Sequence, residues 1–203
     1  SSYLAQQIAR ELGCTADHIG FVQFHPSYDY TDFVEGIRPI QDGGKDIGFK
    51  PKDGVFKQFC EKALTAYLNA DNEADAPKFV FIIDEINRGN MSKIFGELFM
   101  LIESDKRGSK LQLLYSDENF SVPQNVYIIG TMNDIDRSVD SFDFAMRRRF
   151  RFVELKADER LEMLSSLEDE ALEAEAIKRM AALNKEIAAV EDLNENYQIG
   201  ASY

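Results

Sequence analysis

Two acidic residues end a short apolar run in the middle of the chain. Residues 79–83 read Phe-Val-Phe-Ile-Ile and are followed directly by Asp84 and Glu85. A strand that ends in two carboxylates suits nucleotide hydrolysis, in which one carboxylate holds Mg²⁺ and the other orients or deprotonates the attacking water. Adjacent acids after a strand also occur as simple caps of the next helix, so the dipeptide alone leaves both interpretations open.

A second apolar run, residues 126–131, leads to Asn133. An amide side chain at the end of a neighbouring strand can hydrogen-bond a phosphate oxygen and a water without adding charge beside two carboxylates. The alternative is that Asn133 forms a turn before Asp134. Neither interpretation is excluded by this segment alone.

Basic residues gather further along the chain, at Arg147, Arg148, Arg149 and Arg151. Arginines at the end of a short helix complement the negative end of its dipole. One of them could instead present its guanidinium to a γ-phosphate held by a neighbouring copy, as an arginine finger supplied in trans.

The elements that would position these side chains alternate between helices and short strands. Helical spacing predicts helices over 2–12, 55–70, 90–102 and 141–148, and apolar runs predict strands over 19–24, 78–83, 126–131 and 150–153. Residues 111–115 and 120–122 are typical of a small hairpin, whereas the Gly- and Asp-rich residues 27–54 predict a long loop or functional insertion. This order predicts an α/β fold with a parallel sheet, whose chemistry gathers at the carboxyl ends of the strands.

Beyond residue 155 the chain changes character. Residues 158–190 are rich in Ala, Glu and Leu at helical spacing. We therefore expect an α/β domain over 1–155 and a small helical subdomain over 156–203.

Composition narrows the class of protein. Hydrophobic residues make up 44% of 203 residues, enough for the core of one domain with a small appendage. No apolar run approaches the roughly 20 residues that span a bilayer, and the start has no secretory pattern, so a cytoplasmic protein without a membrane contact is expected. A net charge of −13 argues against coating a nucleic acid, and Cys14 and Cys60 are typical of reduced core thiols.

Taken together, three segments resemble the AAA+ NTPase domain of the McrB family. They are residues 81–98 (FIIDEINRGNMSKIFGEL), 132–138 (MNDIDRS) and 145–150 (AMRRRF). The resemblance extends to residues 24–28, 32–36 and 197–203, and so covers nearly the whole chain. That family supplies the GTPase subunit of restriction systems specific for modified cytosine, within the dynein-related AAA group.

The resemblance implies roles for the strand-end residues. Asp84 and Glu85 are similar to the Walker B pair, with Asp84 on Mg²⁺ and Glu85 on the water. Asn133 is similar to sensor 1, which contacts the bound nucleotide. Residues 24–28 match the family as well, and the loop that follows is then a candidate for the channel of a ring, although a His-Pro pair after a strand is more typical of a turn.

The arginines and their neighbours also gain roles from the resemblance. Arg148 or Arg149 is implied as the trans finger, and the sequence does not separate them. Asp136 and Arg137 are implied as a pair at the nucleotide site or the interface between copies. Residues 134–135 depart from the family's pattern, which has Thr and Ala there, and so add a charge near the site.

The phosphate-binding pattern Gly-x-x-x-x-Gly-Lys-Ser/Thr is absent from these 203 residues. Gly44 and Lys45 come closest, but Asp46 follows them. Because residues 3–12 resemble the helix after that loop, we expect the chain to begin just beyond it, without the first strand of the sheet. This predicts a distorted or swapped sheet, or completion by upstream residues, and weak nucleotide binding by the isolated chain.

The expected function is hydrolysis of ATP or GTP with Mg²⁺ by a ring of copies, expected to be a hexamer, that powers DNA translocation or cleavage with a McrC-like nuclease. DNA would be bound through domains outside this chain. Two alternatives remain: a non-hydrolysing assembly module that keeps the ring interface, and a MoxR-like chaperone ATPase.

Overall fold

The computed structural model divides into two compact units, Ser1–Arg149 and Phe150–Tyr203. The residues that it describes are 2–41, 47–133, 144–155, 169–190 and 197–199. The domain boundary after residue 155 that the sequence suggests stays a prediction.

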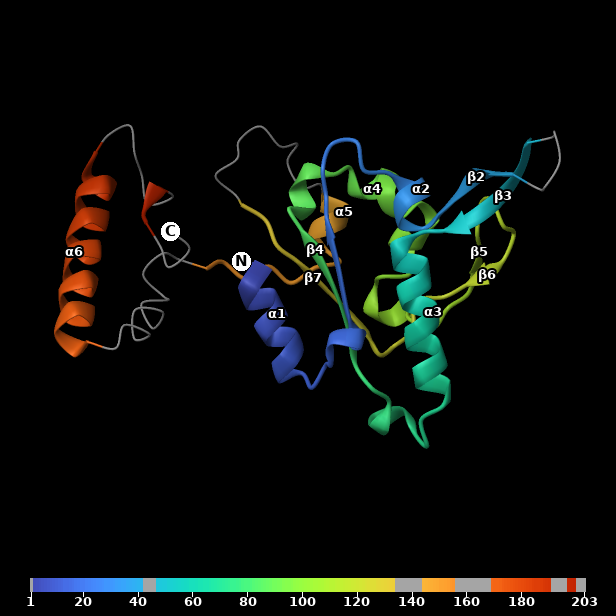
Figure 1. Ribbon diagram of the computed structural model, residues 1–203, viewed down its shortest axis with the longest axis horizontal. Coiled ribbons are helices and arrows are strands. Elements are labelled where there is room, and N and C mark those ends of the chain that lie inside the picture. The colour runs from blue at the N-terminus through green and yellow to red at the C-terminus, as the bar shows by residue number, and fades with distance from the viewer. Residues whose placement is uncertain (1, 42–46, 134–143, 156–168, 191–196, 200–203) are drawn as a thin grey trace. The chain divides into compact units, whose positions relative to one another are not determined.

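Three parallel strands form the sheet of the first unit. They are β1 (Ile19–Gln23), β4 (Phe79–Asp84) and β7 (Val126–Gly130), in the order β1-β4-β7 (Figure 1). The predicted parallel sheet flanked by helices is confirmed. Among the described residues β7 pairs with β4 alone, so no strand partner is seen there on its other edge.

Helices cover both faces of β4, because alternate residues of a strand point to opposite faces. On one face Val80 and Ile82 pack in a buried cluster with Ala5 and Ala9 of α1 (Ser2–Glu11). On the other face the ring of Phe81 lies 5.1 Å from Phe56 of α3 (Val55–Leu68). Figure 1 shows α1 and α3 on opposite sides of the strands. A strand buried on both faces explains the continuous apolar run.

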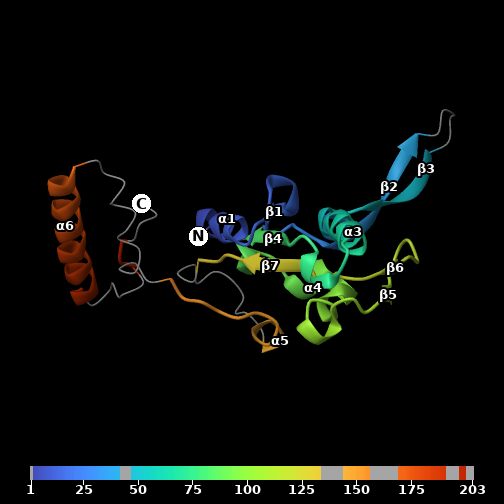
Figure 2. The same ribbon diagram turned by 90° about the horizontal axis from the view of Figure 1, so that it is seen from below.

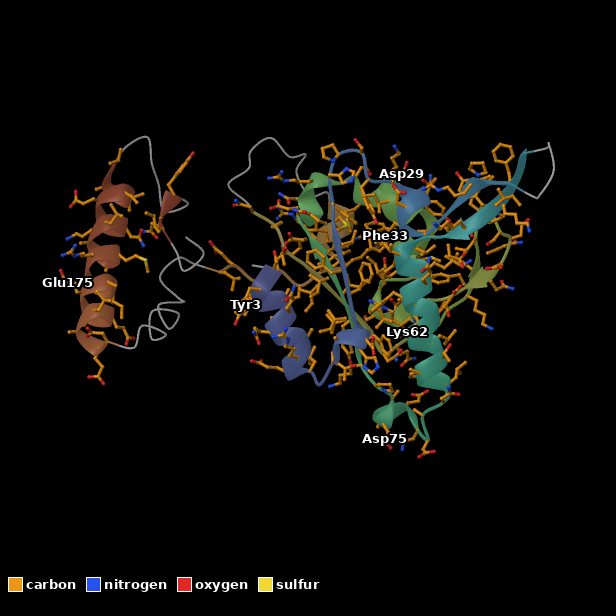
Figure 3. The ribbon with its side chains drawn as sticks, viewed as in Figure 1. Tyr3, Asp29, Phe33, Lys62, Asp75 and Glu175 are labelled. Carbon is orange, nitrogen blue, oxygen red and sulfur yellow. The ribbon has the colours of Figure 1, made fainter. Side chains whose placement is uncertain are left out.

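Aromatic rings fill the space between α3 and the segment after β1. Phe33, labelled in Figure 3, lies at the end of α2 (Tyr30–Phe33). Its ring stacks on that of Phe56 at 4.8 Å and lies 4.6 Å from that of Phe95. Asp29 caps α2, since its carboxylate accepts hydrogen bonds from the backbone N–H and the hydroxyl of Thr31. These contacts fix the chain just beyond the carboxyl end of β1.

The prediction of a long loop over residues 27–54 was wrong. After α2 the chain forms an antiparallel hairpin of β2 (Glu35–Gln41) and β3 (Ile47–Asp53), which extends away from α3 (Figure 2). Pro39 and Pro51 made the segment look like a loop in the sequence, because proline lacks the N–H that a central strand needs. Proline is tolerated in a strand whose edge has no hydrogen-bonded neighbour. Among the described residues β2 and β3 pair only with each other and leave such edges.

A buried lysine fastens the base of this hairpin to α3. The side chain of Lys57 is 2% exposed, and its ammonium group lies 2.5 Å from Asp53 and 2.6 Å from Glu118. Glu35, which is fully buried, is 3.8 Å away. Burial alone would lower the pKa of Lys57, but the hydrogen bonds to Asp53 and Glu118 raise it above its usual value. The lysine therefore stays charged and joins these elements.

The predicted helix over residues 90–102 is interrupted. It begins as α4 (Met91–Phe95) and continues as a 3₁₀ helix, Gly96–Met100. Gly96 has φ of +52° and ψ of −131°, a conformation outside the helical regions that glycine adopts without a steric penalty, and the α-helix ends there. The break turns Glu97 toward Tyr30, whose hydroxyl donates to its carboxylate at 2.6 Å.

The remaining elements of the first unit are short. The predicted hairpin is confirmed in smaller form as β5 (Leu111–Gln112) and β6 (Asn119–Phe120), and the helix near residue 145 is seen as α5 (Phe144–Arg147). Further 3₁₀ turns are Ala16–His18, Glu73–Asp75, Ile86–Arg88 and Ser104–Lys106.

The prediction of a strand over residues 150–153 was wrong. Residues 151–155 form neither helix nor strand and are exposed. A strand requires a hydrogen-bonded neighbour, and no described strand pairs with this segment.

The second unit contains α6 (Glu170–Ala189), which Asp169 caps through the backbone N–H groups of Ala171 and Leu172. Asn184 holds a later segment against this helix: its side chain donates to the carbonyl of Ile199 and accepts from the N–H of the same residue. The acidic helix predicted over 158–190 is confirmed for the part that is described. In the described residues no helix is long and apolar enough to cross a membrane.

Candidate functional site

Asp84 lies at the carboxyl end of β4 and receives two hydroxyl groups. Ser2, at the start of α1, and Thr131, just after β7, both donate to Asp84 Oδ1 at 2.5 Å. The backbone carbonyl of Asp84 accepts from the N–H of Phe24 at 2.9 Å. The start of α1, the end of β1 and the end of β7, which are far apart in the sequence, thus all contact Asp84.

Glu85 adopts a backbone conformation that is rare for a residue with a side chain. Its φ of 51° and ψ of 44° lie in the left-handed region, which costs a non-glycine residue on the order of 1 kcal/mol. The side chain of Glu85 is 25% exposed, and its carboxylate forms an ion pair with Arg88, Nε to Oε2 3.0 Å. Strained backbone conformations of this kind cluster at functional sites, and this one lies directly after the end of β4.

Asn133 is exposed and follows β7 by three residues. Its backbone carbonyl accepts a hydrogen bond from the side chain of Asn87 at 3.2 Å. The other polar atom of this amide, Asn87 Oδ1, is buried without a hydrogen-bond partner among the described residues. Asn87 therefore ties the turn after Glu85 to the segment that carries Asn133.

The two candidate arginines have different surroundings. Arg149 is 13% exposed and forms an ion pair with Glu103, while its Nε donates to the carbonyl of Phe99. Arg148 is exposed. Asp136 and Arg137, which the resemblance implies at the nucleotide site or at the interface between copies, lie outside the described residues.

The segment after β1 forms a turn at residues 25–28, as a His-Pro pair suggests. The N–H of Tyr28 donates to the carbonyl of His25 at 2.9 Å, and the ring of Tyr28 stacks on Phe24 at 5.0 Å. Burial, assisted by the charges of Asp32 and Asp29, raises the pKa of Tyr28 to about 12. Tyr28 is therefore protonated at neutral pH.

Three residues of the site were missed by the sequence reasoning: Ser2, Thr131 and Asn87. The rule that chemistry gathers at strand ends could have found Thr131, which directly follows β7. Ser2 carries no local signal, because its partner is 82 residues away in the sequence.

The oxygen atoms at this strand end fit a magnesium ion. The Asp84 carboxylate and the Ser2 hydroxyl offer the oxygen ligands that hard cations prefer, and the Thr131 hydroxyl donates to the same carboxylate. No group of three or more His, Cys, Asp or Glu residues that could hold a metal by itself occurs within the described ranges. This is the pattern expected of Mg²⁺, which is commonly bound by one or two carboxylates together with substrate phosphates.

The chain is similar in sequence to components of two known restriction enzymes. The chain is 41% identical over 196 residues to the type IV methyl-directed restriction enzyme EcoKMcrB subunit of Escherichia coli K12, covering 91% of this chain and 40% of that protein. It is 27% identical over 185 residues to the type II restriction enzyme BsuMI component YdiS of Bacillus subtilis, covering 78% of this chain and 54% of that protein. The chain thus spans about half or less of the length of these relatives.

A more distant match is a crystal structure from Cytophaga hutchinsonii, with 13% identity and a TM-score of 0.43 over 98% of this chain and 47% of that chain. It is too distant to carry an argument. The family model of the AAA domain, dynein-related subfamily, matches residues 2–150. This match includes every described strand and all of the strand-end residues above, and the chain therefore belongs to the dynein-related subfamily of AAA domains.

Proposed function

We propose that this chain is the catalytic part of an AAA domain that hydrolyses ATP or GTP. The observation that carries the proposal is the meeting of Asp84, Glu85 and the Asn133 segment at the carboxyl ends of two paired parallel strands. Two carboxylates and an amide at one edge supply the groups that phosphoryl transfer to water requires.

Each side chain has a distinct task in this proposal. Asp84, with the hydroxyl of Ser2, would hold Mg²⁺, which when bound neutralises charge on the phosphate oxygens. Glu85 accepts a proton from the attacking water or orients it. Asn133 hydrogen-bonds the γ-phosphate and that water without adding charge. The ion pair between Glu85 and Arg88 keeps the carboxylate at the site until substrate is bound.

Hydrolysis would require a neighbouring copy, which supplies Arg148. This guanidinium is exposed, whereas Arg149 is bonded to Glu103 within its own chain. A ring of copies, expected to be a hexamer, gives each site an arginine from the next subunit. Asp136 and Arg137 belong to the same interface in this proposal.

The identity with the EcoKMcrB subunit supports a role in a restriction system. The ring would couple hydrolysis to DNA translocation or cleavage through a McrC-like nuclease subunit, with DNA bound by other parts of the full-length protein. The second unit would act as a helical lid, and a cytoplasmic location stays a prediction. The net charge of −13 agrees with a nucleotide-driven part that does not itself coat DNA.

The test is steady-state hydrolysis of ATP and of GTP by the full-length protein at concentrations that form the ring. Glu85→Gln keeps the size of the side chain and removes its basicity, so we expect turnover to fall by 10²-fold or more with nucleotide binding retained. Glu11→Gln, on the exposed side of α1, is the matched control. The nucleotide that is turned over identifies the base.

The alternative of a non-hydrolysing assembly module makes the opposite prediction. In that case the full-length protein forms rings but turns over neither nucleotide, and Glu85→Gln changes nothing that can be measured. This chain alone, assayed beside the full-length protein, should bind either nucleotide weakly, and a micromolar dissociation constant would contradict that expectation.

A further inference from the structure

Thr131 makes three hydrogen bonds to the end of β4 and to the turn that follows it. Its N–H donates to the carbonyl of Ile83, its own carbonyl accepts from the N–H of Ile86, and its hydroxyl donates to the carboxylate of Asp84. The two backbone bonds are 2.9 Å long, and the residue is 8% exposed. The three hydrogen bonds connect Thr131 to both sides of the turn that contains Glu85.

The two backbone bonds enclose Asp84 and Glu85 between them. The first continues the pairing of β7 with β4, and the second holds Ile86 after the chain has passed through the left-handed conformation of Glu85. A rare backbone conformation persists only where its surroundings hold it. The backbone of Thr131 therefore fixes the turn from which both carboxylates project.

The hydroxyl of Thr131 also holds the side chain of Asp84 in one orientation. It donates to Oδ1, the same oxygen that accepts from Ser2. Among the described residues no donor reaches Oδ2. The carboxylate is thus held through one oxygen, while the other remains available to a metal ion or to its water.

We propose that Thr131 is a positioning residue for the metal site: its hydroxyl fixes the rotation of the Asp84 carboxylate so that Oδ2 is presented to Mg²⁺. The inference rests on the proposed function, because it assumes that Asp84 holds the ion. Partners that orient a metal ligand from behind typically contribute a factor of 10 to 100 in metal affinity. Ser2 alone does not fix the carboxylate, since a single hydrogen bond still permits it to rotate.

The test uses the full-length protein with Mn²⁺ as a spectroscopic substitute for Mg²⁺. Free and bound Mn²⁺ are measured by electron paramagnetic resonance in the presence of a non-hydrolysable analogue of ATP or GTP. Thr131→Val keeps the shape and removes the hydroxyl, Thr131→Ala removes it in a smaller side chain, and Thr131→Ser retains it. Thermal unfolding of each variant reports on packing separately.

We expect the Mn²⁺ dissociation constant to rise about tenfold in both Thr131→Val and Thr131→Ala and to stay within twofold in Thr131→Ser. Wild-type affinity in a folded Thr131→Val or Thr131→Ala protein overturns the inference. Equal losses in all three variants overturn it as well, because packing and not the hydroxyl would then be responsible.

The same experiments distinguish a failure of the proposed function from a failure of the inference about Thr131. If wild-type protein binds the Mn²⁺ and nucleotide complex but turns over neither nucleotide, hydrolysis is disproved while the comparison of the Thr131 variants still decides the inference. If wild-type protein binds no such complex, both are wrong.

Discussion

The guanidinium of Arg149 is bonded to Glu103 of its own chain, with Nη2 2.5 Å from Oε1, and it also lies 4.2 Å from the centre of the Phe99 ring. An arginine held by an ion pair, a carbonyl and an aromatic face has a structural task in its own subunit. Its neighbour Arg148 is exposed, and in the proposed function it is the arginine that acts on the site of another copy.

Alanine substitutions should separate these two arginines. Arg148→Ala is expected to lower kcat by about 10³-fold or more without changing the unfolding temperature, because it removes charge stabilisation from a neighbouring site. Arg149→Ala is expected to lower the free energy of unfolding by about 1 to 3 kcal/mol, because a largely buried ion pair is broken. Hydrolysis and thermal unfolding of the full-length protein measure both.

Mixing of inactive variants tests whether the arginine acts in trans. Arg148→Ala subunits retain Glu85, and Glu85→Gln subunits retain Arg148, so mixed rings contain some complete sites and should regain turnover. Arg147→Ala, also at an exposed position, serves as the control. Loss of activity in Arg149→Ala at unchanged stability, with Arg148→Ala fully active, would reverse the assignment.

Lys57 should be essential to the stability of the first unit. Lys57→Met leaves the fully buried Glu35 without its nearest cation, which we expect to cost about 3 to 5 kcal/mol of unfolding free energy. Adding Glu35→Gln should restore part of the loss, because the buried charge is then removed. Lys62→Met on the same helix is exposed and should change stability by about 0.5 kcal/mol or less. Urea unfolding measures all three, and equal effects at both lysines would contradict the prediction.

Asp29 should give the protein a component of stability that acid removes. The side-chain hydrogen bond from Thr31 lowers the pKa of Asp29, against the opposing effect of burial. A carboxyl whose pKa is lower in the folded state stabilises the fold above its unfolded pKa and loses that contribution as the pH falls through the folded value, here below about 4. The stability difference between wild type and Asp29→Asn should therefore shrink between pH 5 and pH 3. A stability difference that stays constant from pH 5 to pH 3 would contradict the prediction that the Asp29 carboxylate stabilises the fold.

Gly96 should tolerate a side chain poorly for two separable reasons. Gly96→Ala places a methyl group on a backbone with φ of +52° and ψ of −131°, which disfavours any residue but glycine, and 2.9 Å from the ring of Tyr30. Gly108 also has a positive φ, +79°, but nothing lies within 4 Å of the added carbon, so Gly108→Ala measures the cost of a positive φ without a clash, about 1 kcal/mol. We expect Gly96→Ala to exceed that cost in urea unfolding, and a smaller cost would mean that Tyr30 moves aside freely.

The sheet and its site edge could be predicted because their signals are local. The apolar run before Asp84 is continuous, since β4 is buried on both faces, and strand pairing then brings Thr131 and Asn133 to the same edge. The roles of Asp84, Glu85 and Asn133 in hydrolysis stay predictions. What the structure adds is how they are held.

The rest depended on contacts between distant residues. Arg149 is distinguished from Arg148 by its hydrogen bond to the carbonyl of Phe99, which lies 50 residues earlier in the chain. Ser2 donates to Asp84, which lies 82 residues later. The hairpin of residues 35–53 was missed because its glycines and prolines are typical of loops, although its pairing is regular from end to end.

The left-handed backbone at Glu85 sets thermostability and turnover against each other at a single position. Glycine or asparagine occupies that conformation more easily than glutamate, so replacement by either should relieve strain while removing the proposed base. Selection of random libraries for heat resistance alone would then favour loss of this acid, whereas selection that also demands hydrolysis would retain it. If the proposed function holds, the glutamate is retained at this position because hydrolysis requires its carboxylate, at a cost in backbone energy.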